Sequence, residues 1–212
     1  MDEYIDILNG EMKPIGVATR GEIHRQGYWH QTFHCWVILL EGDCPYILFQ
    51  KRHPSKETFP NQLDISAAGH ILKGETVEDG VRELHEELGI HVDYSELIPL
   101  GMYKGNYITE TYKDREFNHI HLLKTNRNLD DFSIQQSELK GLYKIDEASF
   151  RALLQGKEQT VKAIGFEFNS SGAKEQKCLL VGRGDFAAQG EGYYDFVFRA
   201  IDNGLKIIVH SH

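Results

Sequence analysis

The segment 69–90 constrains the fold more than any other part of the chain, because it predicts a helix with two different faces. Apolar residues recur at helical spacing and predict a buried face, namely Val81, Leu84 and Leu88. Acidic residues recur on another face, namely Asp79, Glu83, Glu86 and Glu87. Gly89 follows the last turn, where glycine commonly ends a helix. The fold must therefore bury one face of this helix and accommodate a concentration of carboxylates beside it.

The acidic face favours a metal site, although an acidic run on a helix is most often a solvated surface. Like charges one turn apart repel by roughly 0.2–0.5 kcal/mol per pair. Glu83, Glu86 and Glu87 share one face, and Mg²⁺ takes carboxylate oxygens while it bridges to substrate phosphates. Arg82 could orient one of these glutamates through a charge-assisted hydrogen bond. We therefore predict that the three glutamates bind Mg²⁺ or Mn²⁺.

The spacing of this segment resembles the Nudix box, whose pattern reads G-x5-E-x7-R-E-U-x-E-E-x-G-U with U aliphatic. Residues 82–90 resemble its second half, and Gly69 and Glu75 resemble its first half. Six residues separate Glu75 from Arg82, where the family pattern has seven. The helix glutamates keep their spacing. The role that the resemblance implies for Glu75 stays open, because a slip of one residue turns a helix by about 100°.

Composition limits the classes of function. The 212 residues suit one large domain, or a core with an appendage, and the formal charge of −9 argues against nucleic-acid binding and against a role on anionic membranes. A nucleotide substrate remains compatible, because a metal can hold it locally. The three cysteines form no close pair, so we expect free thiols in a reducing cytosol. Without a signal peptide or a long apolar run, a cytoplasmic protein is expected.

Periodicity and turn signals predict strands on both sides of the acidic helix. They cover a hairpin within 4–20 and the segments 33–40, 46–51, 63–68, 97–107, 116–124 and 136–145. Asp146 should cap a short helix over 147–154. The Nudix resemblance implies the topology, an α+β fold in which a mixed sheet lies between helices as an α/β/α sandwich.

The last part of the chain lies beyond the expected Nudix domain, which we place at 1–156 with its N-terminal strands. Residues 157–212 predict a hairpin over 161–181 and a helix over 192–203. No Pro- or Ser-rich linker precedes this tail, so we expect an extension that packs on the core.

The flanks of the box resemble the Nudix branch that contains isopentenyl-diphosphate isomerase. The stretches that carry this resemblance are Trp29-His30, Gln50-Lys-Arg52, Thr58-Phe-Pro60 and 64–70. It implies that the metal-binding histidines of the isomerase fall on His24, His30 and His70. It also implies that the proton-transferring cysteine of the isomerase falls on Ala68. Alanine cannot transfer a proton, whereas the box is nearly complete, so the resemblance favours hydrolysis.

We therefore predict a metal-dependent Nudix hydrolase that cleaves a pyrophosphate linkage in a small-molecule substrate, nucleoside-diphosphate-linked or another diphosphate. Two alternatives stay open: an isomerase-like enzyme acting on a prenyl diphosphate, and a Nudix module that binds a nucleotide without turnover. The resemblance also allows a homodimer.

The predicted site residues form three groups, and several of them have a plainer reading as surface or structural residues. The metal ligands are Glu83, Glu86 and Glu87. The residues assigned to catalysis are Arg82, Glu86, Glu87 and Glu138, with Glu110 and Glu116 as alternative bases. The residues assigned to substrate binding are Lys51, Arg52, Gly69 and His70.

Overall fold

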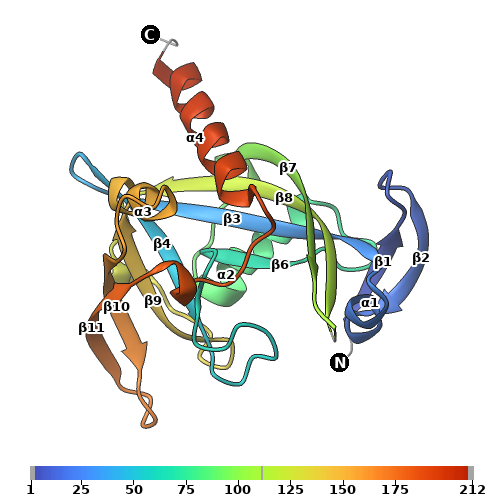
Figure 1. Cartoon of the computed structure of the whole chain (residues 1–212), viewed down its shortest axis with the longest axis horizontal. Coiled ribbons are helices and arrows are strands. Elements are labelled where there is room, and N and C mark those ends of the chain that lie inside the picture. Colours follow the sequence, from blue (N-terminus) through green and yellow to red (C-terminus); the bar gives the residue numbers. More distant parts are fainter. Residues whose placement is uncertain (1–2, 111, 210–212) are drawn as a thin grey trace.

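One branched sheet organises the structure. The computed structural model describes residues 3–110 and 112–209, and the eleven strands within these ranges hydrogen-bond into a single sheet (Figure 1). The strands are β1 (Tyr4–Leu8), β2 (Pro14–Thr19), β3 (Trp29–Glu41), β4 (Cys44–Arg52), β5 (Leu63–Asp64), β6 (Ala67–His70), β7 (Ile98–Ile108), β8 (Lys113–Thr125), β9 (Leu139–Asp146), β10 (Val161–Phe168) and β11 (Lys174–Val181). The main path runs β11-β10-β9-β4-β3-β1-β2, so the two terminal hairpins lie at opposite ends. Only β3 and β8 pair in parallel among these strands, which confirms the predicted mixed sheet.

Helices cover both faces of the sheet, as the predicted α/β/α sandwich requires. They are α1 (Arg20–Gln26), α2 (Arg82–Leu88), α3 (Glu147–Leu154) and α4 (Tyr193–Val209). Alternate residues of β3 point to opposite faces of the sheet, so Phe33 packs in the core against Leu84 of α2. Trp36 packs in the other core, with Phe150 of α3 and Val197 of α4. Figure 1 accordingly shows α2 and α4 on opposite sides of β3.

The helix predicted within 69–90 starts with a tighter turn than an α-helix. A 3₁₀ turn covers Glu78–Val81, α2 follows directly, and Gly89 ends it with a φ of 68°. A 3₁₀ turn rises about 2.0 Å per residue, against about 1.5 Å in an α-helix. The same distance is therefore spanned by fewer residues than an α-helix would need, and this turn lies where the box is one residue short.

Two local expectations differ from the structure. The predicted strand 63–68 is two strands, because β5 pairs with β4 and β6 pairs with β3. Between them the buried Ser66 hydroxyl accepts from Val37 N at 2.9 Å and donates to Leu48 O, so the chain turns there from one strand to another. In addition, α1 forms where only a polar stretch is predicted. Thr19 caps its start and Gly27 ends it in the left-handed conformation.

The C-terminal part of the chain extends the sheet and then returns to the core. β10 pairs with β9, and β11 pairs with β10. The chain next passes β5, where Ala187 N donates to Leu63 O at 2.8 Å and Gln189 Nε2 donates to Asp64 Oδ1 at 3.0 Å. This contact brings the segment 187–189 beside the strands that lead to α2. The boundary after residue 156 stays a prediction.

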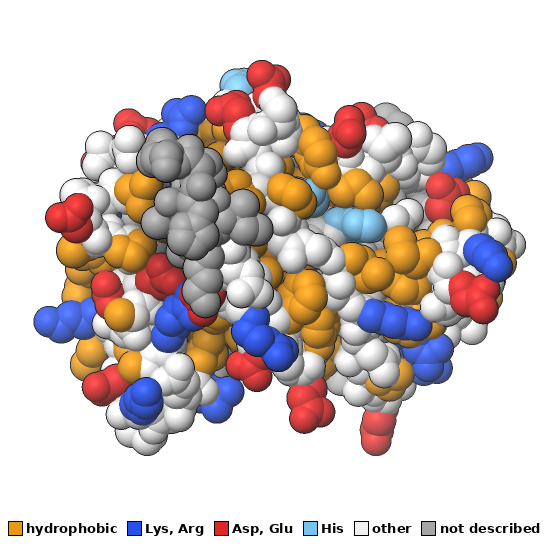
Figure 2. All heavy atoms as spheres, turned by 90° about the horizontal axis from the view of Figure 1, so that it is seen from above, with side chains coloured by type: hydrophobic (Ala, Val, Ile, Leu, Met, Phe, Trp, Pro, Cys, Tyr) orange, Lys and Arg blue, Asp and Glu red, His pale blue; other side chains and the backbone are white. Residues whose placement is uncertain are grey.

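The surface around α4 carries charges of both signs. Figure 2 shows acidic and basic side chains interspersed over this face, without one large patch of a single sign. In the part of the chain that the structure describes, no helix is long and apolar enough to cross a membrane.

Candidate active site

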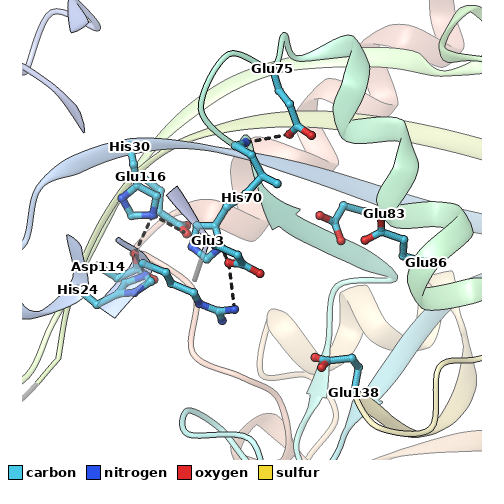
Figure 3. A network of polar contacts seen from close by, with 12 residues as sticks. Glu3, His24, His30, His70, Glu75, Glu83, Glu86, Asp114, Glu116 and Glu138 are labelled. Carbon is cyan, nitrogen blue, oxygen red and sulfur yellow. Dashed lines mark hydrogen bonds and ion pairs between the residues drawn. The ribbon is translucent and has the colours of Figure 1, made fainter. Parts of the chain in front are cut away.

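A cleft of about 500 Å³ opens beside α2 and is lined from both ends of the chain, from Glu3 to Gln189. Its carboxylates are Glu3, Asp64, Glu75, Glu83, Glu86, Glu87, Asp114, Glu116 and Glu138, and its Lys and Arg residues are Arg20, Arg52, Lys56 and Arg82. Figure 3 shows Glu83 and Glu86 of α2 facing the same space as Glu138, with the histidines on a third side. The structure thus brings the predicted helix glutamates and Glu138 into one strongly acidic cleft.

Two of the helix glutamates are held against β6. The side chain of Glu83 is buried beside Gly69, where an added Cβ would lie 2.0 Å from Glu83 Oε1. Only glycine leaves room for this carboxylate. Glu87 Oε2 accepts from Ala68 N at 3.0 Å and from Gln50 Nε2 at 3.4 Å. Gly69 therefore admits a carboxylate to the cleft, whereas its predicted contact with substrate stays a prediction.

The same two glutamates hold protons more tightly than exposed carboxylates do. Burial raises the pKa of Glu83 to about 6, against the opposing effect of Arg82. Burial also raises the pKa of Glu87 to about 8, and the neighbouring charge of Glu83 adds to this shift. A divalent cation bound here would lower both pKa values, because it would add positive charge to that of Arg82 and Lys56.

Arg82 fastens the start of α2 to the loop before it. Its Nε and Nη2 donate to the two oxygens of Glu75 at 3.1 and 3.2 Å, and Nη2 also donates to His70 O at 2.8 Å. Its Nη1 donates to Glu83 and, at 3.2 Å, to Glu86 Oε2. Arg82 therefore contacts three carboxylates that line the cleft, and Glu75 is one of them despite the short spacing.

The two basic residues at the end of β4 face opposite sides. Lys51 Nζ pairs with Glu167 Oε1 at 3.0 Å, and Lys51 is not among the residues that line the cleft. Arg52 lines the cleft and donates to Asp64 Oδ2 at 2.9 Å. Successive side chains of a strand point to opposite faces, so both could not reach the cleft together.

The loop after β4 supplies a cation that sequence reasoning missed. Lys56 lines the cleft and pairs with Glu138, the predicted base. Of the alternative bases, Glu116 lines the cleft, whereas Glu110 is exposed and lies outside its lining.

A cluster of histidines and acids borders the cleft. One ligand atom from each of His24, His30 and His70 lies within 4.8 Å of the others, and the same holds for His30, Asp114 and Glu116. Among the described residues, His24 Nε2, His30 Nε2 and Asp114 Oδ1 are buried without a hydrogen-bond partner. Burial raises the pKa of Glu116, and the charge of Asp114 adds to this. These orphaned buried atoms fit the ligands of a metal ion.

The pairing of β3 with β8 assembles this cluster. His30 lies opposite Glu116 in the parallel register, and Asp114 stands two residues before Glu116 on the same face of β8. The signal that could have found Asp114 is this spacing of two between acids on a strand. Sequence reasoning identified Glu116 but not its neighbour.

Comparison with known proteins identifies the family. Residues 29–164 match the family model described as NUDIX domain. The chain belongs to the Nudix family. This Nudix protein is 42% identical over 200 residues to the uncharacterised Nudix hydrolase CA_C0446 of Clostridium acetobutylicum, covering 94% of this chain and 97% of that relative. It is 30% identical over 159 residues to Nudix hydrolase 3 of Arabidopsis thaliana, covering 72% of this chain and 20% of that protein.

Two further matches concern the branch of the Nudix family and the fold of the chain. An isopentenyl-diphosphate isomerase of Corynebacterium diphtheriae is 39% identical over 83 residues, covering 38% of this Nudix chain and 44% of that protein. The crystal structure of DR0079 from Deinococcus radiodurans superposes with a TM-score of 0.57 at 21% identity, covering 74% of this chain and 91% of that one. These findings confirm the predicted family, the Nudix fold and a hydrolase acting on pyrophosphate bonds.

Proposed function

We propose that this Nudix hydrolase cleaves a pyrophosphate linkage in a small substrate, nucleoside-diphosphate-linked or another diphosphate, with divalent cations bound in the cleft. The charge of the cleft carries this proposal, because nine carboxylates line it and only four Lys and Arg side chains do. A diphosphate is itself anionic, so such a cleft would repel it unless cations neutralise the carboxylates. We further propose that the protein acts in the cytoplasm as a small-molecule enzyme, and the homodimer stays a prediction.

Two groups of side chains fit cations of different chemistry. Glu83, Glu86 and Glu87 offer carboxylate oxygens, which suit Mg²⁺ or Mn²⁺. The Nε2 atoms of His24 and His30 make no hydrogen bond and lie 3.6 and 3.7 Å from Asp114 Oδ1. They suit a transition-metal ion better, because imidazole is a softer ligand than carboxylate. A bound divalent cation would supply charge that polarises the phosphate and lowers the pKa of a water molecule.

The remaining roles follow from what each side chain faces. Glu138 lies across the cleft from α2 and is the proposed base, with Lys56 holding its carboxylate in place. Arg52 and Lys56 are the proposed phosphate contacts, because both line the cleft. His70 also lines the cleft and is proposed to contact substrate or metal. Lys51 has no part in this proposal, since its charge is paired with Glu167 away from the cleft.

An isomerase activity is the second candidate, favoured by the histidine and acid cluster and by the Corynebacterium relative. Ala68 speaks against it, because a methyl group cannot carry a proton to or from an allylic carbon. The other alternative is a module that binds a nucleotide without turnover. Its support was the Nudix box, which is one residue short between Glu75 and Arg82. The contact between Arg82 and Glu75 weakens that support.

A hydrolysis screen tests the proposal. The purified protein is incubated with Mg²⁺ or Mn²⁺ and with nucleoside diphosphates and triphosphates, nucleotide sugars, dinucleotides, coenzyme A and prenyl diphosphates, and released phosphate and nucleotide are measured. Glu87→Gln should lower kcat by about 10²-fold or more, in line with the loss of one charge-stabilising group. The matched control is Glu158→Gln, an exposed carboxylate outside the cleft. No hydrolysis of any of these substrates by a folded, Mg²⁺-binding protein would refute the proposed activity, and formation of dimethylallyl diphosphate would favour the isomerase.

A further inference from the structure

A row of buried polar side chains connects the C-terminal helix to the cleft. We call it the polar ladder, and its members are Trp36, His34 and Thr32 of β3, Asn118 and Glu116 of β8, and Tyr193 of α4. The three β3 residues alternate along one face of the strand, and Asn118 lies opposite Thr32 in the parallel register. Thr32, His34 and Glu116 line the cleft. The ladder therefore links a residue of the extension to cleft groups.

The direction of hydrogen bonding is set at the far end of the ladder. An indole N–H can only donate, and Trp36 Nε1 donates to Tyr193 Oη at 3.2 Å. The Tyr193 hydroxyl proton then needs an acceptor. Among the described residues that acceptor is His34 Nδ1, which lies 2.8 Å away. Accepting this proton requires an unprotonated Nδ1, so the neutral imidazole carries its proton on Nε2.

The charge state of His34 agrees with this assignment. The His34 side chain is only 6% exposed, and burial lowers its pKa to about 3. The ring is therefore neutral at the pH of a cytoplasm, and the tautomer is the remaining variable. The opposite tautomer would leave the Tyr193 hydroxyl proton without an acceptor in the part of the chain that is described.

At the cleft end of the ladder, two donors have no close acceptor within the ladder. Asn118 Nδ2 uses its two protons on Thr32 Oγ1 at 2.8 Å and Glu116 Oε2 at 2.6 Å. His34 Nε2 lies 3.4 Å from Thr32 Oγ1 and 3.4 Å from Asn118 Nδ2, so a proton on this nitrogen has only a long contact with the Thr32 hydroxyl as acceptor. The Thr32 hydroxyl proton has no acceptor among these groups. Both donors line the cleft, so an oxygen there can accept from them.

We propose that Tyr193 is a positioning residue that holds His34 as the Nε2–H tautomer, so that the polar ladder presents neutral donors from His34 and Thr32 to an oxygen of the bound diphosphate. The identity of that oxygen rests on the proposed function, whereas the tautomer does not. A neutral donor stabilises charge without giving up its proton, which suits a group that lines the same cleft as the proposed metal ligands. The extension thus takes part in the site through a buried hydrogen bond.

The tautomer is measured first, in the full-length protein labelled with ¹⁵N-histidine. A long-range ¹H–¹⁵N correlation spectrum distinguishes Nδ1–H from Nε2–H, and a His34→Gln spectrum assigns the signals. We expect the His34 proton on Nε2 in the wild type and a shifted Nδ1 signal in Tyr193→Phe. Tyr194→Phe is the matched control, since it removes a neighbouring hydroxyl on α4 outside the ladder. A wild-type proton on Nδ1, or an unchanged Nδ1 signal in Tyr193→Phe, would overturn the proposal.

Kinetics test the link to the reaction. Tyr193→Phe should lower kcat about tenfold with a smaller change in KM, and His34→Asn, which has no donor at the Nε2 position, should lower it about 10²-fold. His34→Gln keeps an amide donor near that position and should restore most of the activity. Adding Tyr193→Phe to His34→Asn should cause no further loss, because the tyrosine acts through the histidine. Effects that simply multiply would show a structural role and refute the proposal.

Failure of the proposed function can be told apart from failure of this inference. If no diphosphate is hydrolysed, the labelled protein is titrated with methylenediphosphonate and Mg²⁺. The His34 Nε2–H signal should shift in the wild type but not on addition of Mg²⁺ alone. An unmoved signal with bound diphosphonate would overturn the proposal even if the tautomer is correct.

Discussion

Replacing Glu87 with glutamine tests the electrostatics of the cleft in the metal-free protein. Burial, with the charge of Glu83 adding to it, raises the pKa of Glu87 from an ordinary 4.5 to about 8. The folded state therefore binds this proton more tightly than the unfolded chain does. The free energy of unfolding should fall as the pH rises from about 4.5 to about 8, and it should level off above that range.

The size of the effect follows from the shift. One pKa unit corresponds to about 1.4 kcal/mol, so the whole shift corresponds to roughly 5 kcal/mol. The free energy of unfolding should therefore fall by roughly 2–3 kcal/mol between pH 6 and pH 9. The lower value is expected, because partial contact of Glu87 with solvent weakens the effect. Glu83 contributes little in this window, because its pKa of about 6 lies at the lower limit.

The assay is urea unfolding at pH 6, 7, 8 and 9 in the presence of a chelator. The wild type should lose stability across this series, and Glu87→Gln should lose much less, since glutamine keeps the oxygen that accepts from Ala68 N. Glu86→Gln is the control, because its side chain is 51% exposed on the same helix and should leave the wild-type slope unchanged. Equal slopes in the wild type and Glu87→Gln would refute the reasoning.

Three further predictions concern the supports of the cleft. Gly69→Ala places a Cβ 2.0 Å from Glu83 Oε1, so the affinity for Mg²⁺, measured by calorimetry, should fall at least about tenfold. Gly21→Ala is the control and should bind Mg²⁺ normally, because its added Cβ has no atom within 4 Å. Arg82→Lys loses a two-pronged contact and should lower the free energy of unfolding by about 1–3 kcal/mol, measured by urea titration; an unchanged midpoint would contradict this. His30→Gln should remove one class of bound Mn²⁺ seen by electron paramagnetic resonance and leave another, and an unchanged stoichiometry would rule out the histidine cluster as a site.

Sequence reasoning succeeded where a local signal decides the structure. The helix Glu147–Leu154 matches its prediction because Asp146 Oδ1 accepts from Ser149 N at 2.8 Å, a cap that its sequence position indicates. It failed where the signal is short or depends on distant residues. The helix α1 has seven residues with Ile23 as its main apolar contact, too few for periodicity to detect.

The candidate site shows the same division. The glutamates of α2 follow from their spacing on one helix, so the sequence could predict them together. The position of Asp114 and Glu116 beside His30 depends on the parallel pairing of β3 with β8, which no local pattern encodes. Lys51 and Lys56 illustrate a second limit, because the orientation of a side chain at a strand end and the path of a loop depend on tertiary packing.

The 3₁₀ turn before α2 changes how such a box should be recognised. What the site needs at this place is that the carboxylate of Glu75 reach the guanidinium of Arg82, and the turn satisfies that need with six intervening residues. What matters is the distance between Glu75 and Arg82, and the number of residues between them is only an indirect measure of that distance. A pattern search that insists on seven residues would discard this chain, although its carboxylates stand together. Tolerance for one insertion or deletion at this turn would therefore recover relatives whose acidic helix face is intact.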